Sequence, residues 1–185
     1  MIIIGITGTI GAGKGTIVEY LTSQKQFKHY SVRSFLLKEI HKRGMETNRD
    51  SMVLIANELR QKHSSSYIID ELMKEAVADG KNGVIESIRN EGEIISLRHH
   101  PHFYLLSVDA QPEIRYQRIQ LRASETDHID YQTFLANEKR ELHSNDPTKQ
   151  NLSRCIELAD YKLINNTTRE DLYLQIEEIF KKLPI

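Results

Sequence analysis

The sequence has little that would indicate a secreted, membrane-spanning or strongly charged protein. Cys155 is its only cysteine, so no intramolecular disulfide can form, which fits a reducing compartment. No segment approaches the roughly 20 consecutive apolar residues of a membrane span, and the first four residues lack the basic region of a secretion signal. The 25 basic and 26 acidic residues give a net charge of −1, without the basic excess that favours nucleic acid or anionic membranes. We therefore expect a cytoplasmic protein with neither as a partner; its oligomeric state stays open.

The 185 residues, 39% of them hydrophobic, suit a single domain over residues 1–185. Apolar, β-branched runs predict strands, and apolar residues at helical spacing predict helices. The predicted strands are 2–7, 30–32, 83–86, 103–108 and 161–164. The predicted helices are 16–23, 34–43, 52–61, 67–78, 91–97, 112–122, 131–143, 152–158 and 170–182. Alternating strands and helices predict an α/β fold, a parallel sheet with helices on both faces.

A glycine-rich loop follows the first predicted strand and precedes a helix. Gly8, four further residues and then Gly13-Lys14 form the frame of a P-loop. Glycines let backbone N–H groups approach phosphate oxygens, the helix N-terminus faces the anion, and lysine brings a cation to the β- and γ-phosphates. The residues expected to bind the nucleotide here are Gly8, Gly11, Ala12, Gly13, Lys14, Gly15 and Thr16. The sequence does not decide between ATP and GTP.

The position directly after the lysine departs from the simplest P-loop pattern. Gly15 stands where that pattern has Ser or Thr, and Thr16 follows. We therefore expect Mg²⁺ to be held largely through water, with the Thr16 hydroxyl near a phosphate oxygen.

Several segments resemble known kinases. Gly-Ala-Gly-Lys-Gly-Thr at 11–16 resembles adenylate kinase and other nucleoside monophosphate kinases. Residues 5–11 and 159–166 resemble dephospho-coenzyme A kinases, and residues 48–52, 56–60 and 84–89 resemble adenylate-kinase-related proteins. The resemblance implies a three-layer P-loop NTPase fold with strand order 2-3-1-4-5, ATP and Mg²⁺ as cofactors, and Asn165 beside the adenine. It also implies a helical acceptor-binding insertion over 33–80 and a short lid over 123–142.

The resemblance carries over to only some acceptor-site residues. Residues 85–89 stand where nucleoside monophosphate kinases have Asp-Gly-Phe-Pro-Arg, so Glu86 would orient magnesium-bound water and Arg89 would grip the acceptor phosphate. Residues 31–34 stand where adenylate kinases have Ser-Thr-Gly-Asp, and only Ser31 matches. Between residues 30 and 37 we find no aspartate like the base of dephospho-coenzyme A kinases. Because a hydroxyl acceptor must lose a proton, this lack weighs against one.

Arginines are the remaining candidates, because phosphoryl transfer depends on positioned positive charge. Arg118 and Arg122 lie four residues apart beside the predicted lid, and Arg140 lies on its far arm. We expect these three to approach ATP or the transferred phosphate. The insertion contributes the candidate acceptor-binding arginines Arg33, Arg49 and Arg60. The alternative for each is a solvated arginine paired with an acid such as Glu113 or Glu138, and we expect that of Arg115.

Two weaker features do not change this interpretation. His99, His100 and His102 match no common metal-site spacing, so we expect an ordinary loop. Asp109 ends a strand and could bind water or cap the next helix. Three functions stay open: a kinase acting on a small nucleoside or deoxynucleoside monophosphate, a dephospho-coenzyme A kinase, and an ATP-binding switch that hydrolyses slowly.

Overall fold

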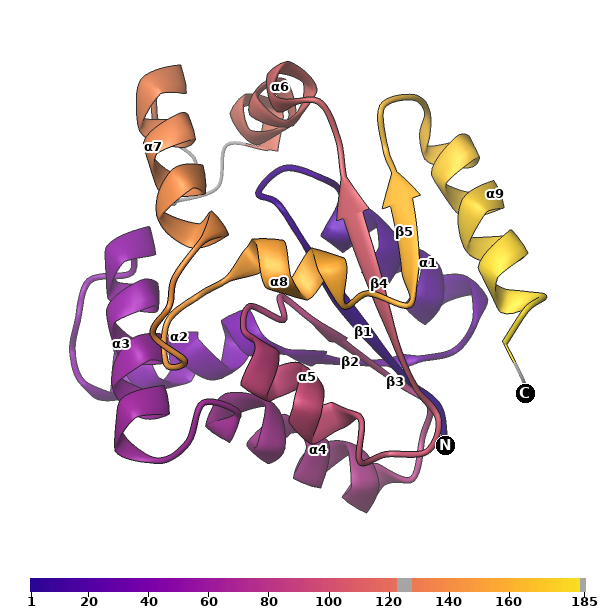
Figure 1. Ribbon diagram of the computed structural model, residues 1–185, viewed down its shortest axis with the longest axis horizontal. Helices are drawn as coiled ribbons and strands as arrows, with labels where there is room; N and C mark the ends of the chain where they lie inside the picture. The colour runs from indigo at the N-terminus through magenta and orange to yellow at the C-terminus, as the bar shows by residue number, and fades with distance from the viewer. Residues whose placement is uncertain (123–127, 184–185) are drawn as a thin grey trace.

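The computed structural model describes residues 1–122 and 128–183, in which strands and helices alternate (Figure 1). The strands are β1 (Ile3–Gly8), β2 (Lys28–Ser31), β3 (Gly83–Glu86), β4 (Phe103–Asp109) and β5 (Tyr161–Ile164). The helices are α1 (Lys14–Gln24), α2 (Val32–Lys42), α3 (Arg49–Lys62), α4 (Tyr67–Asp79), α5 (Glu91–Leu97), α6 (Pro112–Arg122), α7 (Tyr131–Leu142), α8 (Leu152–Glu157) and α9 (Arg169–Phe180). None of the described helices has the length and apolar character needed to cross a membrane.

All described strands pair in parallel in one sheet, in the order β2-β3-β1-β4-β5. The central strand is β1, whose Ile3 is aligned with Gly83 of β3 on one side and with Phe103 of β4 on the other. A strand covered on both faces tends to be apolar throughout, which explains the isoleucine-rich start of the chain. The predicted three-layer P-loop fold and its strand order are confirmed.

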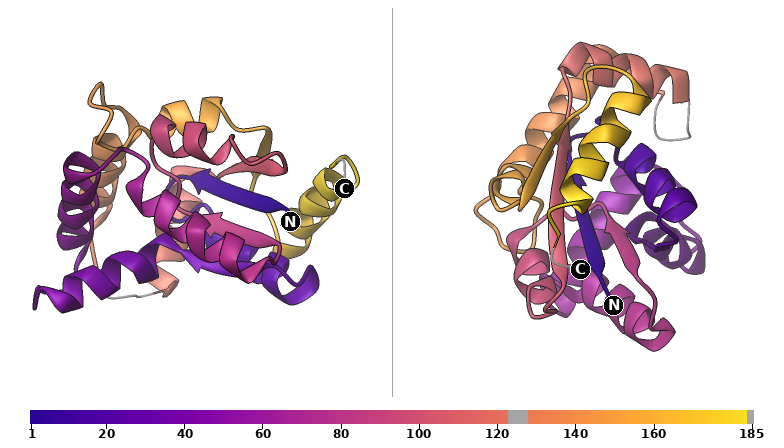
Figure 2. Two further views of the ribbon diagram at one scale, coloured as in Figure 1. Left: turned by 90° about the horizontal axis from the view of Figure 1, so that it is seen from below. Right: turned by 90° about the vertical axis from the view of Figure 1, so that its right-hand side faces the viewer.

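Helices cover both faces of the sheet (Figure 2), because alternate side chains of each strand point to opposite sides. Ile4 and Ile6 pack into one buried cluster with α1 and α9. Ile3 packs into a second cluster, which α2, α3, α4, α5 and α8 complete on the opposite face. Because the strands are parallel, their carboxyl ends lie at the same edge of the sheet. The P-loop follows β1 and therefore lies at that edge.

Two predicted boundaries are wrong for local reasons. The second strand was expected over 30–32, but β2 begins at Lys28. Its early residues are polar because β2 is an edge strand, where Lys28 pairs with Asp79 on α4. The third helix was expected to begin at residue 52, but α3 begins at Arg49, because Asn48 caps it, its Oδ1 accepting a 2.8 Å hydrogen bond from the backbone N–H of Ser51.

Helices α2 and α3 of the expected insertion contribute side chains to the cavity beside the P-loop. Helices α2, α3 and α4 occupy the stretch expected as the insertion, between β2 and β3. Part of the expected lid, 123–127, lies outside the described residues, and α7 forms its far arm. Phe134 of α7 is fully buried against Ile119 of α6 and Ile10 of the P-loop, so this arm packs directly on the nucleotide-binding loop.

Candidate active site

The glycines of the P-loop are required by its backbone. Gly8, Gly11 and Gly13 have φ angles of 138°, 78° and 109°, in the left-handed region that favours glycine. A Cβ atom at Gly8 would lie 2.0 Å from the Val108 carbonyl oxygen, and one at Gly13 would lie 2.2 Å from Nδ2 of Asn165. By contrast, a Cβ at Gly15 would meet no atom within 4 Å. The loop is thus tightly fitted against β4 and the β5–α9 turn, while Gly15 faces open space.

Gly8→Ala is expected to lower the free energy of unfolding by about 2 kcal/mol or more, from its φ angle and its clash with a backbone oxygen. For a chain of this length that corresponds to a fall of about 5 °C in the melting temperature. Thermal unfolding without nucleotide measures it. Gly15→Ala is the matched control and should melt at the parent's temperature or up to about 4 °C above it; equal losses in both variants would contradict this account of the loop.

Lys14 begins α1 and folds back over the loop. Its Nζ donates hydrogen bonds of 2.8 Å to the carbonyl oxygens of both Gly8 and Thr9. Burial lowers the pKa of Lys14 to about 7, and the nearby charge of Arg89 acts in the same direction, while Glu86 opposes both. The ammonium form of Lys14 is therefore much less favoured than that of an exposed lysine.

ATP binding should take up a proton at alkaline pH, because the anionic phosphates favour the charged form of Lys14. Below pH 7 the lysine is protonated with or without ATP, so no uptake is expected from it there. Above pH 7 the free protein has lost this proton and regains it on binding, so affinity falls as pH rises. Calorimetry at pH 8 in two buffers of different ionisation enthalpy measures the uptake. Lys14→Arg, which stays charged, should abolish it; equal uptake in both proteins would contradict the assignment.

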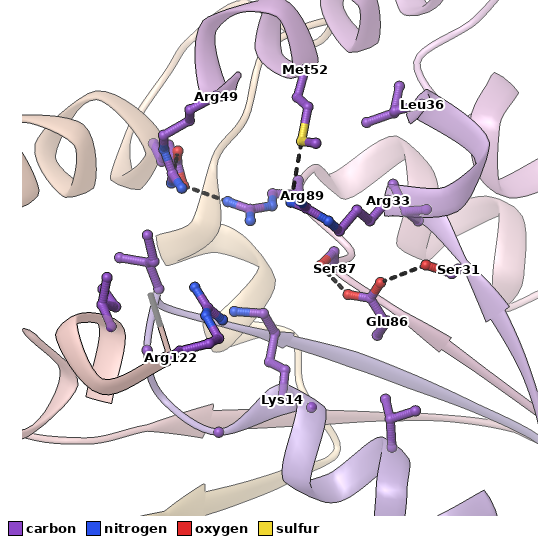
Figure 3. Close-up of a pocket in the computed structure, with 18 of the residues that line it drawn as sticks. Lys14, Ser31, Arg33, Leu36, Arg49, Met52, Glu86, Ser87, Arg89 and Arg122 are labelled. Carbon is purple, nitrogen blue, oxygen red and sulfur yellow. Dashed lines mark hydrogen bonds and ion pairs between the residues drawn. The ribbon is translucent and has the colours of Figure 1, made fainter. Parts of the chain in front are cut away.

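A cavity of about 1140 Å³ opens over the P-loop and extends to the helical insertion. Figure 3 shows side chains from the P-loop, the insertion and the loop after β3 around the same space. The predicted residues that line it are Gly11, Gly13, Lys14, Gly15, Thr16, Arg33, Arg49, Arg60, Glu86, Arg89, Arg118 and Arg122. The predicted residues outside its lining are Gly8, Ala12, Arg140 and Asn165. The structure thus brings most of the candidates into one cavity, although they come from distant parts of the sequence.

Glu86 lies at the carboxyl end of β3, aligned with Ser31 of β2. One of its oxygens accepts a 3.3 Å hydrogen bond from Ser31 Oγ, and the other accepts one from Ser87 Oγ. Burial opposes ionisation of the carboxyl group, but the imidazole of His29, 3.8 Å away, the hydrogen bond from Ser87 and the charge of Lys14 outweigh it, and the pKa of Glu86 lies below its ordinary value. A carboxylate therefore faces the cavity on the side where the phosphates of a nucleotide would lie.

These residues fit a magnesium ion of the kind that accompanies ATP. Mg²⁺ prefers oxygen ligands, and at nucleotide sites it keeps several waters and uses few protein groups. The ionised carboxylate of Glu86 and the hydroxyl of Thr16 are suitable oxygen donors that line the cavity. Among the described residues no group of three or more His, Cys, Asp or Glu could hold a metal by itself. These two donors therefore suit an ion that is held mainly by phosphates and water.

Arg89 is fixed at both its backbone and its side chain. Its N–H donates a 2.7 Å hydrogen bond to Glu93, whose other oxygen accepts one of 2.8 Å from Arg60. Its guanidinium donates to Glu141 of α7 and, at 3.0 Å, to Gln150. Arg60 and Glu93 are nearly inaccessible, with side chains 2% and 1% exposed. Arg60 thus anchors the loop that carries Arg89.

Sequence reasoning missed Glu141 and Glu93 as parts of this site. Glu141 forms ion pairs with both Arg49 and Arg89, and its side chain is 3% exposed. A signal for it does exist, since Glu141 lies in the last turn of a helix, where the helix dipole disfavours an acid. Arg49 lies in the first turn of α3, where the dipole disfavours a cation. Each residue thus lies at the helix end that disfavours its charge, and the ion pair between the two explains both positions.

The arginines beside the lid differ in what they contact. Arg118 donates a 2.8 Å hydrogen bond to the backbone oxygen of Asn165. Arg122 lines the same cavity as Lys14 (Figure 3). Arg140 pairs instead with Asp50 at 3.3 Å, in an exposed contact outside the cavity lining. The position of Arg140 over the transferred phosphate stays a prediction.

Arg115 corrects an expectation, because it is buried rather than on the surface. Its side chain is 4% exposed and pairs with Glu138 of α7. It also donates to the carbonyl oxygens of Ala110, at 2.7 Å, and of Ile10, at 3.3 Å. The ion pair with Glu138 is therefore inside the protein, where it joins α7 to the P-loop.

Asn165 contacts the P-loop itself. Its Nδ2 donates a 2.8 Å hydrogen bond to the carbonyl oxygen of Ala12, and its side chain lies against Gly13. Asp109, at the end of β4, accepts 2.6 Å and 2.9 Å hydrogen bonds from Thr9 Oγ1 and the Ala110 N–H. Both residues therefore hold the P-loop from the β4–β5 side of the sheet.

A parallel sheet with this strand order and a P-loop at its central strand define a P-loop nucleotide-binding protein with a kinase-like fold. A family model described as an AAA domain matches residues 4–144, and the chain belongs to this family. A UPF0200 protein of Methanocaldococcus jannaschii is 27% identical over 186 residues, covering 99% of this chain and 91% of that protein.

Solved structures share the fold. TT1252 from Thermus thermophilus has a TM-score of 0.66 and 19% identity, over 100% of this chain and 98% of that one. Shikimate kinase from Acinetobacter baumannii, solved with shikimate, has a TM-score of 0.61 and 14% identity, over 100% and 96% of the two chains. These similarities show a shared fold and do not distinguish the adenylate kinase subtype from the dephospho-coenzyme A kinase subtype.

Proposed function

We propose that this protein is an ATP-dependent phosphotransferase that transfers the γ-phosphate to a nucleoside or deoxynucleoside monophosphate. One observation carries the proposal: the P-loop lysine and the arginines of the expected acceptor side line a single cavity. Lys14 lies at one end of this arrangement, and Arg49 and Arg89 lie toward the insertion. Phosphoryl transfer between two anionic molecules needs positive charge on both sides of the transferred group.

The same arrangement gives each group a role in the reaction. Lys14 and the backbone N–H groups of the P-loop would bind the β- and γ-phosphates of ATP. Arg89 would hold the acceptor phosphate in line with the γ-phosphate, since a guanidinium presents a planar set of donors to phosphate oxygens. Mg²⁺ held near Thr16 and Glu86 would neutralise charge on the phosphates. The apolar side chains of Leu36 and Met52, which also line the cavity, would contact the remainder of the acceptor.

A coupled ADP-release assay tests the proposal. The purified protein is incubated with Mg²⁺ and ATP, and in parallel with GTP, against a panel of ribonucleoside and deoxyribonucleoside monophosphates. At least one acceptor should raise the rate of ADP or GDP release about tenfold or more above the acceptor-free rate. If no monophosphate accelerates release with either nucleotide, the proposed acceptor class is wrong.

A hydroxyl acceptor is the alternative, and the position of Glu86 favours it. The second strand lacks an aspartate of its own, but β3 brings the Glu86 carboxylate within 3.3 Å of Ser31 at the end of that strand. An ionised carboxylate at that point could accept the proton of an attacking hydroxyl. Adding dephospho-coenzyme A and small polyols to the same panel distinguishes the two classes. ADP release that is accelerated by dephospho-coenzyme A or a polyol, and by no monophosphate, would identify a hydroxyl acceptor.

A further inference from the structure

Two ion pairs connect the insertion to the lid arm. Each element contributes two residues that are consecutive in the sequence. Arg49 and Asp50 begin α3, and Arg140 and Glu141 lie in the last turn of α7. Arg49 pairs with Glu141, and Asp50 pairs with Arg140 at 3.3 Å. The Asp50 and Arg140 side chains are 82% and 48% exposed, whereas those of Arg49 and Glu141 are 18% and 3% exposed. One pair is therefore in water, and the other is inside.

The inner contact joins three residues. One oxygen of Glu141 accepts from Arg49, and the other accepts from Arg89. Two guanidinium groups from separate elements thus share one carboxylate, which offsets the repulsion between their charges. The charges of Arg89 and Arg49 outweigh the effect of burial on Glu141 and keep its pKa below the ordinary value. The carboxylate is therefore ionised when it holds the two arginines.

The bridge leaves donors of both arginines unused. A guanidinium carries five N–H donors, and Glu141 engages one nitrogen of each. The buried Nε of Arg49 has no hydrogen-bond partner within the described residues. Both side chains line the cavity that contains Lys14 (Figure 3). Two adjacent guanidinium groups with spare donors are suited to an anionic group that has several oxygens, such as phosphate or carboxylate.

We propose that Glu141 is a positioning residue that holds Arg49 and Arg89 together and thereby forms the subsite for the anionic group of the acceptor. The identification of that anion with an acceptor rests on the proposed function. Because Glu141 belongs to the lid arm and Arg49 to the insertion, the subsite exists only while α7 lies against α3.

Inorganic phosphate tests the subsite without any turnover. The P-loop is first saturated with a non-hydrolysable ATP analogue and Mg²⁺, and phosphate is then titrated by calorimetry. Glu141→Gln keeps the size of the side chain but replaces one acceptor oxygen with an amide donor that faces a guanidinium. It should weaken phosphate binding at least about tenfold and leave the affinity for the ATP analogue within about threefold.

Asp50→Asn is the matched control, because it removes one carboxylate charge from the exposed pair between the same two helices. Its phosphate affinity should stay within about twofold of the parent. Glu141→Asp keeps the charge, but its shorter side chain cannot reach both arginines. It should weaken phosphate binding about threefold or more, and it serves as the test if Glu141→Gln does not fold.

Three outcomes would overturn the proposal. An unchanged phosphate affinity in the Glu141 variants would show that the carboxylate does not position the arginines. A higher affinity in Glu141→Gln would show that Glu141 competes with the anion for them. Absence of phosphate binding by the parent protein would show that the arginine pair is not an anion subsite. None of these results depends on catalysis, so a failed acceptor screen would contradict the proposed function separately.

Discussion

Lys14→Ala is expected to lower the rate of phosphoryl transfer by at least about a hundredfold, the scale found when a group that stabilises transition-state charge is removed. Lys14 is the only lysine that lines the cavity within the described residues. Its Nζ is held over the P-loop by two backbone oxygens, ready to turn to the β- and γ-phosphates. Single-turnover measurement of ADP formation gives the rate, and titration of a fluorescent ATP analogue gives the affinity.

Lys74→Ala is a suitable control for the removal of a lysine. The Lys74 side chain is 73% exposed and pairs only with Glu71 of the same helix among the described residues, so transfer should be unchanged within error. Retention of transfer within about threefold in Lys14→Ala would show that Gly8–Thr16 does not act as a catalytic P-loop.

Arg89→Ala is expected to raise the KM for the acceptor at least about thirtyfold while ATP affinity changes less than about threefold. A hydrogen bond to a charged group contributes about 2 kcal/mol, which corresponds to this factor. Arg89 lies after β3, on the insertion side of Lys14, so its loss removes contacts to the acceptor. Initial rates with each substrate varied in turn measure the two constants.

The control for Arg89→Ala must account for the buried acid that it leaves behind. Glu141 keeps Arg49 as a partner, so we expect the variant to fold with a lower melting temperature. Arg154→Ala removes a half-exposed arginine that pairs with Glu91 and Glu157, and it should leave both KM values unchanged. Equal loss of ATP binding and acceptor use in Arg89→Ala would show that Arg89 does not belong to the acceptor side.

The sequence predicted the central part of the fold well, because burial on both sides leaves a direct mark on a strand. The isoleucine-rich start and the segment 103–108 were recognised as strands for that reason. The edge strand β2 was less visible, since Lys28 and His29 are polar, are not buried and carry no apolar pattern. Its position depends on pairing with β3, and that pairing is not encoded within β2 itself.

The site could be predicted only where a local pattern carries the chemistry. The P-loop is such a pattern, since its glycines and lysine are close in sequence. Contacts between distant segments were missed or misjudged. Glu141 lies 52 residues beyond Arg89, and the burial of Arg115 depends on how α7 packs over α6. Such contacts depend on tertiary packing, which the spacing of residues within one segment does not predict.

The hydrogen bond from Asn165 to Ala12 bears on how much of the chain is needed to support the P-loop. The family model ends at residue 144, yet the segment beyond it supplies the Asn165 amide that supports the P-loop. The same segment contributes Leu163, Leu172 and Ile176, which are buried against the first strand and first helix. A fragment limited to residues 4–144 would expose that apolar face, and its P-loop would lack the hydrogen bond from Asn165. The smallest piece of the chain that folds by itself is therefore expected to be longer than the matched family segment and to include α9.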